Sequence, residues 1–138
     1  MTGTLPTELV LLPYLQSLSL SWNEFTGTIP PEFGEMKHLL DIEFHWNHLT
    51  GTIPPIYYDS PTLASFNVGG NAITGSIPAD KIAGLSKIKG FFVDENLLNG
   101  TIPTELGQLS LLRKYIRFLL SRNNCSHHFT NLLDLCIL

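Results

Sequence analysis

Apolar residues recur along this chain in a pattern that repeats about every 24 residues. Each repeat has the order apolar-x-x-apolar-x-apolar-x-x-Asn, so its last two apolar positions flank a single variable residue. Alternation with a period of two is typical of a short strand with one buried face. The pattern therefore predicts one strand per repeat, stacked in a parallel sheet. The apolar positions are Leu15, Leu18, Leu20, Leu39, Ile42, Phe44, Leu63, Phe66, Val68, Ile88, Phe91 and Val93.

An asparagine ends each strand, and a glycine and a proline follow it. The asparagines are 24, 24 and 25 residues apart, and the glycine always comes four residues later. The Asn amide can satisfy backbone groups that the bend exposes, so we expect a ladder of asparagines. The glycine is expected at positive φ, and the proline turns the chain outward. These positions are Asn23, Asn47, Asn71 and Asn96; Gly27, Gly51, Gly75 and Gly100; and Pro30, Pro54, Pro78 and Pro103.

A short 3₁₀ or α turn is expected after each proline, because apolar residues such as Phe33, Met36 and Leu39 recur there about every third position. Such a unit cannot bury its apolar face alone, so several copies must stack. Gly69 and Gly70 leave the outward face of the third repeat bare. The fourth repeat has one extra residue before its strand, which a convex loop can absorb.

The segments "LSLSWNEFTGTIPPEFGEM" and "FFVDENLLNGTIPTELGQL" closely resemble the plant-type leucine-rich repeat. The resemblance covers residues 3 to 112. It implies an α/β repeat fold, a right-handed solenoid with a parallel concave β-sheet and short 3₁₀ or α turns on the convex side. On this basis residues 1–14 form an incomplete first repeat, 15–112 the plant-type repeats, and 113–138 an irregular C-terminal cap or tail.

The segment after Pro103 departs from the pattern. Asn123 follows Pro103 by 20 residues where the first repeats use 17, and no Gly-x-Ile-Pro comes after it. The segment fits either a fifth strand at Phe118 to Leu120 or an amphipathic helix. We favour the helix as an end cap, because a solenoid end exposes its core. The helix would have Leu109, Leu112, Ile116 and Leu119 on its apolar stripe and Arg113, Lys114, Arg117 and Arg122 on its charged face.

Charge and hydropathy exclude several classes of protein. Charged residues make up 14% of the chain and the net charge is -4, which leaves no broad basic surface for nucleic acid. No run approaches the ~18 apolar residues of a membrane span, and the N-terminus lacks the features of a signal peptide. The chain begins inside a repeat, so a truncated gene product without independent function is one alternative.

Two clusters contain side chains capable of chemistry. Cys125, His127, His128 and Cys136 are zinc-competent, but their spacing fits no closed site, and a polar tail with free thiols or a disulfide is the better interpretation. Glu43, His45 and His48 have no nucleophile or oxyanion donor nearby. We therefore expect no catalytic residue, no metal site and no cofactor. The sequons at Asn99 and Asn124 matter only in a secretory pathway.

The outward positions of successive strands form columns on the concave sheet, and these positions vary while the scaffold repeats. Exposed tryptophans beside acidic residues are typical of a recognition surface. An alternative is that the tryptophans pack along the rim and cover the asparagine ladder. The predicted ligand-binding residues are Trp22, Asp41, Glu43, His45, Trp46, Asn67, Phe92, Asp94 and Glu95.

The function expected from these features is non-catalytic recognition of a protein or peptide, with a basic partner favoured by the acidic concave face. The resemblance implies a receptor-like ectodomain at the cell surface or outside the cell, with a co-receptor or a second copy as further partners. A secreted inhibitor of a hydrolytic enzyme is the alternative within the same family. An ice-binding array is disfavoured, because the concave columns mix unlike residues.

Overall fold

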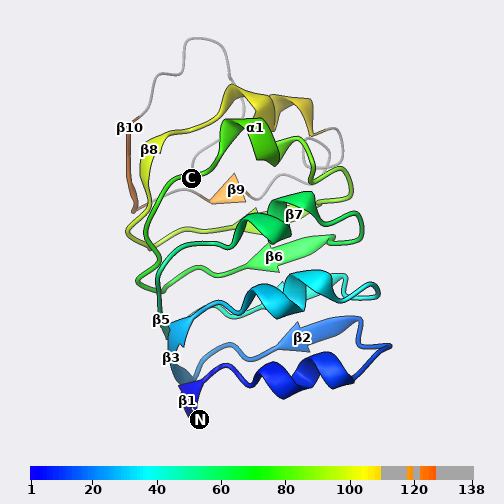
Figure 1. Ribbon diagram of the computed structural model, residues 1–138. Helices are drawn as coiled ribbons and strands as arrows, with labels where there is room; N and C mark the ends of the chain where they lie inside the picture. The colour runs from blue at the N-terminus through cyan, green and yellow to red at the C-terminus, as the bar shows by residue number, and fades with distance from the viewer. Residues whose placement is uncertain (110–117, 120–121, 127–138) are drawn as a thin grey trace.

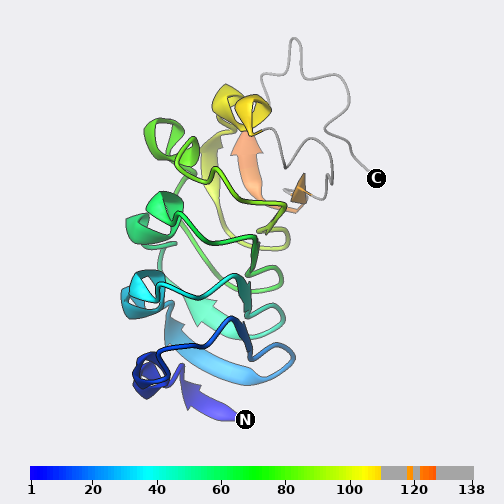
Figure 2. The ribbon, with the colours of Figure 1, turned by 90° about the vertical axis from the view of Figure 1, so that its right-hand side faces the viewer.

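The computed structural model describes residues 1–109, 118–119 and 122–126. These residues coil into a leucine-rich-repeat solenoid that rises from the N-terminus, one turn for each repeat (Figure 1). The short helical turns stack in a column along one side (Figure 2). None of the helices in the described ranges has the length and apolar character needed to cross a bilayer.

Five parallel strands form the concave sheet, in the order β2, β4, β6, β7, β9. Equivalent repeat positions are in register, so Ser17 lies beside Asp41, then Ser65, then Gly90. In β2, β4 and β6 the middle residue is buried between two more exposed ones, as the alternation predicts. The strands are β2 (Ser17–Ser19), β4 (Asp41–Glu43), β6 (Ser65–Asn67), β7 (Gly90–Phe92) and β9 (Phe118–Leu119).

The favoured capping helix after Leu109 is wrong at Phe118 and Leu119, which form β9 and pair with β7. Asn123 explains why the solenoid continues. Its Nδ2 donates to the carbonyl of Val93 at 2.9 Å, and its Oδ1 accepts from the N–H of Leu98 at 3.0 Å. A fifth solenoid turn places this amide within reach of the fourth repeat. Residues 110–117 and 120–121, which carry the rest of the helix prediction, lie outside the described residues.

Helical turns follow the prolines, as predicted. Pro31 and Pro55 occupy the first turns of η2 and η3, where a missing N–H costs nothing. Most of these turns send a buried apolar residue into the core, among them Phe33, Tyr57 and Ile82, whereas η1 has none. The turns are η1 (Thr7–Leu11), η2 (Pro31–Glu35), η3 (Pro55–Asp59), α1 (Ala79–Ile82) and η4 (Thr104–Gln108).

A second set of parallel pairings runs along the segment between the asparagine and the proline of each repeat, where the sequence predicted only a turn. The bridge from Thr52 to Thr74 continues this pairing between β5 and β8. Threonine hydroxyls reinforce it, since Thr50 donates to the carbonyl of Gly27 at 3.3 Å and Thr74 to that of Gly51 at 3.0 Å. The strands are β1 (Thr2–Thr4), β3 (Glu24–Thr28), β5 (His48–Thr50), β8 (Asn99–Thr101) and β10 (Asn124–Ser126).

The repeated glycine is required here for two reasons, as Gly51 shows. Its φ is +78°, a conformation that side chains rarely adopt, which confirms the expected positive φ. A Cβ added there would also lie 2.8 Å from Cγ2 of Thr28 in the preceding repeat. The glycine therefore permits both the turn and the close stacking of the second sheet.

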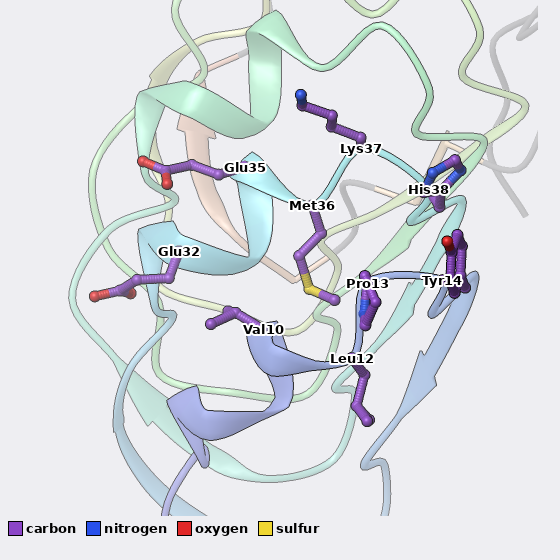
Figure 3. A pocket seen from close by; sticks show the side chains of 9 residues that line it. All are labelled: Val10, Leu12, Pro13, Tyr14, Glu32, Glu35, Met36, Lys37 and His38. Carbon is purple, nitrogen blue, oxygen red and sulfur yellow. The ribbon is translucent and has the colours of Figure 1, made fainter.

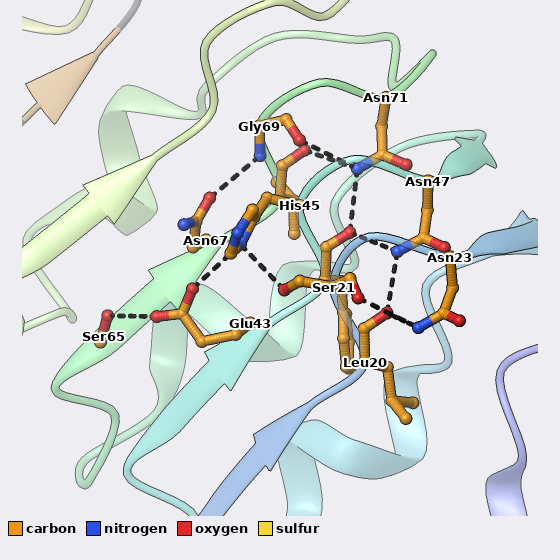
Figure 4. Close-up of polar contacts among 12 residues, drawn as sticks. Leu20, Ser21, Asn23, Glu43, His45, Asn47, Ser65, Asn67, Gly69 and Asn71 are labelled. Atoms are coloured by element: carbon orange, nitrogen blue, oxygen red, sulfur yellow. Dashed lines mark hydrogen bonds and ion pairs between the residues drawn. The ribbon is translucent and has the colours of Figure 1, made fainter.

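The asparagine ladder joins consecutive turns through buried hydrogen bonds (Figure 4). Nδ2 of Asn47 donates to the carbonyls of Leu20 and Phe44, each at 3.0 Å, and Oδ1 accepts from the N–H of Phe25 at 3.0 Å. Asn71 makes equivalent contacts one repeat further on. Each amide thus ties its own turn to the preceding one.

We expect Asn47→Ala to lower the free energy of unfolding by about 2–4 kcal/mol, because backbone groups of two repeats lose a buried partner at about 1–3 kcal/mol each. Urea unfolding checks this. Asn99→Ala is the matched control, since Asn99 is exposed in β8, and its effect should stay below about 0.5 kcal/mol. Equal effects at the two positions would contradict a ladder that carries the fold.

Candidate binding site on the concave sheet

The concave sheet gathers all nine predicted residues on one surface. Asp41, Glu43, Asn67 and Phe92 lie within its strands and are half-buried. The other five follow their strands directly, and all are at least partly exposed. They are Trp22, His45, Trp46, Asp94 and Glu95. Their role in binding a ligand stays a prediction.

Trp22 and Trp46 stack on each other, as their shared column predicts. Their ring centroids are 5.2 Å apart and their planes meet at 21°. His45 meets the Trp22 ring nearly perpendicularly, at 6.1 Å and 84°. Trp22 is 72% exposed and Trp46 is 43% exposed, so the stack projects from the sheet into solvent.

The backbone beneath this stack is unusual for tryptophan. The residue before the ladder asparagine has positive φ, 57° at Trp22 and 56° at Trp46. The same position carries Gly70 in the third repeat, with φ 64°. The ladder continues at Asn96, where the preceding residue is Glu95, so the ladder contacts do not require a tryptophan at this position. Trp22 and Trp46 therefore adopt a strained backbone conformation at a repeat position that glycine can occupy.

The expectation that Gly69 and Gly70 leave the third repeat bare is wrong, because neighbouring side chains lie over them. A Cβ at Gly70 would lie 2.8 Å from the Trp46 ring, and a Cβ at Gly69 would lie 2.8 Å from an Asp94 carboxylate oxygen. These glycines give the larger side chains of adjacent repeats room to lie close to the sheet.

A polar chain crosses the sheet beside the tryptophans (Figure 4). Nδ1 of His45 lies 2.9 Å from Oγ of Ser21 and 3.2 Å from Oε2 of Glu43. Ser65 donates to the other Glu43 oxygen at 3.3 Å. Ser21 and Ser65 are not among the residues that the sequence predicts for the site, because their contacts depend on side-chain direction and not on repeat position.

The Ser21, His45 and Glu43 contacts differ from a catalytic relay in one decisive respect. In a Ser-His-acid triad the serine and the acid use different ring nitrogens, so that a proton enters at one and the charge is balanced at the other. Here both partners face Nδ1. The geometry orients the imidazole and holds Glu43 in place, and it does not activate the serine hydroxyl.

The other chemistry-bearing clusters do not assemble in the described residues. His48 begins β5 in the second sheet, apart from Glu43 and His45 in the concave sheet. No group of three or more His, Cys, Asp or Glu there is arranged to hold a metal ion. His127, His128 and Cys136 lie outside the described residues.

The charges at the C-terminal side of the sheet are set by Asp94 and Glu95. Burial raises the pKa of Asp94 above its ordinary value, and Glu95 adds to the rise, while a backbone hydrogen bond and His45 oppose it. Glu95 forms an ion pair with Arg122 at 3.0 Å. The predicted place of Arg122 on the face of a helical cap is wrong, because its positive φ before Asn123 puts it in the column of Trp22, Trp46 and Glu95.

A hollow of about 550 Å³ on another side of the molecule is a weaker candidate (Figure 3). The Glu32 and Glu35 carboxylates and the Lys37 ammonium point away from Met36, and only Tyr14 and His38 lie beside each other, with ring centroids 5.7 Å apart. The concave sheet, with its connected polar and aromatic groups, is the better site. The lining residues are Val10, Leu12, Pro13, Tyr14, Glu32, Glu35, Met36, Lys37 and His38.

Comparison with known proteins by sequence gives one family. The family model described as Leucine Rich Repeat matches residues 14–36. None of the curated proteins matches the sequence.

Solved structures match over most of the chain. The plant peptide hormone receptor RGFR1, in complex with RGF2, is 34% identical, with a TM-score of 0.81 over 90% of this chain and 19% of that one. The ectodomain of the Arabidopsis receptor kinase HAESA, in complex with an extended IDA peptide hormone, is 29% identical, with a TM-score of 0.81 over 90% and 20%. A chain of the Arabidopsis thaliana BIR3–SERK2 complex is 30% identical, with a TM-score of 0.78 over 91% and 64%. The chain therefore spans about a fifth of the two hormone receptors.

We expect Trp22→Gly to leave the free energy of unfolding within about 1 kcal/mol of the parent, since lost ring stacking and relieved backbone strain offset each other. Trp22→Ala keeps the strain and should be less stable than the glycine variant by about 1 kcal/mol. At Ser19 in β2 the order should reverse, with alanine the more stable. A loss above about 2 kcal/mol in Trp22→Gly would show that the indole serves the scaffold.

We expect the free energy of unfolding of Asp94→Asn, relative to that of the parent, to increase as pH rises from 3 to 7. The pKa of Asp94 in the folded state lies above its ordinary value of 3.8. Between the unfolded and folded pKa values, the folded state therefore binds more protons than the unfolded state. The free energy of unfolding of the parent falls as pH rises through this range. The amide cannot ionise and escapes this loss. Thermal unfolding at both pH values measures the difference. A difference between Asp94→Asn and the parent that stays the same at both pH values would contradict the burial effect.

Proposed function

Because this chain is a leucine-rich-repeat protein of the plant type, we propose that its concave sheet recognises an extended peptide or a protein surface without catalysis. The observation that carries this proposal is the exposed Trp22–Trp46 stack on backbone that favours glycine. Side chains that strain the backbone and stay in solvent add little to folding. A binding partner that covers them supplies the missing stabilisation.

The dimensions of the sheet suit an extended partner. Neighbouring parallel strands lie about 4.8 Å apart, and an extended peptide rises about 3.3 Å per residue. A peptide laid across the strands therefore meets a new repeat about every one and a half residues. Its side chains would meet different columns in turn, from Trp22 in the first repeat to Asp94 in the fourth.

The similar proteins support this assignment. Two of them are plant receptors described with bound peptide hormones, RGF2 for RGFR1 and IDA for HAESA. A structure of the Arabidopsis receptor kinase HAESA with the peptide hormone IDA and the co-receptor SERK1 is also similar to this chain, and it supports a second kind of partner, a co-receptor. The description of the HAESA match as an ectodomain also supports a location at the cell surface or outside the cell. The Nδ1 geometry of His45 supports binding in preference to catalysis.

We expect Glu43→Lys to weaken peptide binding at least tenfold, because it reverses a half-buried charge beside His45 at the centre of the face. Peptides selected from a random library against the parent protein provide the probe, and isothermal titration measures their affinity. Glu8→Lys is the matched control, since Glu8 is exposed in η1 away from the concave sheet, and binding should be unchanged. Peptides that lose affinity for the Glu8 variant and not for the Glu43 variant would contradict the proposed function.

A further inference from the structure

We propose that the free face of Trp22 receives an arginine side chain of the ligand, with the acidic groups of the concave sheet favouring that cation. This inference rests on the proposed function and deepens it, since it names the residue type that the site selects. Three features carry it: the state of the two indole faces, the balance of charge across the sheet, and the shape of the cation that fits both.

The stack leaves one indole face open. Trp46 lies against Gly70 on one side, close enough that a Cβ on that glycine would lie 2.8 Å from the ring. Trp22 covers Trp46 at 5.2 Å, and His45 contacts Trp22 nearly perpendicularly. Trp22 is nevertheless 72% exposed, so its ring is supported by Trp46 and much of it is open to solvent. A ligand group meets a fixed aromatic surface and need not order it first.

The charge balance of the sheet favours a cation at this surface. Asp41, Glu43, Asp94 and Glu95 contribute four carboxylates to the nine predicted residues. Arg122 pairs with Glu95, and His45 with Glu43. Among the described residues no ion pair neutralises Asp41 or Asp94. An approaching cation therefore meets a surface on which two carboxylates have no ion-pair partner among the described residues.

Arginine fits these conditions better than lysine. A cation over an indole is attracted by the ring quadrupole. The guanidinium is planar, stacks on aromatic faces, is weakly hydrated and keeps in-plane N–H donors for carboxylates while stacked. The lysine ammonium is compact and strongly hydrated, and it gains less from a flat surface. An arginine over Trp22 would thus gain from the indole quadrupole and from the negative potential of the sheet together.

Peptides selected against the parent protein test this inference. We expect arginine to be enriched among them, and replacement of that arginine by citrulline, its neutral isostere, to weaken binding about tenfold. Replacement by lysine should weaken binding by a smaller factor. Trp22→Leu in the protein should reduce the citrulline effect to less than threefold, because the stacking surface is gone. Tyr14→Leu is the control, since Tyr14 is an 80% exposed aromatic residue outside the concave sheet, and it should preserve the full citrulline effect.

The tryptophans provide a second readout, because Trp22 and Trp46 are the chain's two tryptophans. The arginine peptide should change their fluorescence, and the citrulline peptide should change it less at equal saturation. Selected peptides without arginine, or a citrulline effect that persists in Trp22→Leu, would overturn the inference while the proposed function stands. If selection yields no peptide that is sensitive to Glu43→Lys, the proposed function falls, and this inference falls with it.

Discussion

The structure depends on one interaction, the hydrogen bonding of each ladder asparagine to two consecutive turns of the solenoid. The bend after each concave strand leaves backbone donors and acceptors that the next strand cannot reach. A side chain with two donors and one acceptor satisfies them, and Asn47 does so while only 6% exposed. Because the same amide contacts the preceding turn, it sets the stacking of the repeats as well as the shape of each bend.

The ladder also determines how the binding surface is presented. The residue before each asparagine has to adopt positive φ for the amide to reach its partners. Its side chain then projects at the edge of the concave sheet, as Trp22, Trp46, Glu95 and Arg122 do. The scaffold therefore creates a strained but prominent column. Gly70 marks the repeat in which this column carries no side chain, and Trp46 lies over that space.

The periodic features of this chain could be predicted from the sequence, because each is repeated several times. The ladder, the register of the concave columns, the helical turns and the proximity of Trp22 to Trp46 all follow from aligning the asparagines. The second set of pairings was missed, because each of its strands carries at most one large apolar residue, which leaves no alternation to recognise. The strand at Phe118 and Leu119 was missed because irregular spacing before Asn123 hid the fifth turn.

The candidate site was less predictable than the fold. Columns show which residues are neighbours, but they do not show which way a side chain leans. The coverage of Gly69 by Asp94 and the convergence of Ser21 and Glu43 on one nitrogen of His45 depend on rotamers and short distances. Such contacts arise from packing between unlike residues, and a single sequence contains no repeated pattern that marks them.

The central claim is that the ladder forms the scaffold and the variable concave residues bind the ligand. The indole N–H resonances of Trp22 and Trp46 test it most directly, since two such signals are expected from the chain and both belong to this surface. In a ¹H–¹⁵N titration with a selected peptide, both indole signals should shift with the same saturation curve as the amides of β4 and β6. Saturating binding that shifts only amides of the helical turns, with both indole signals unmoved, would contradict the claim.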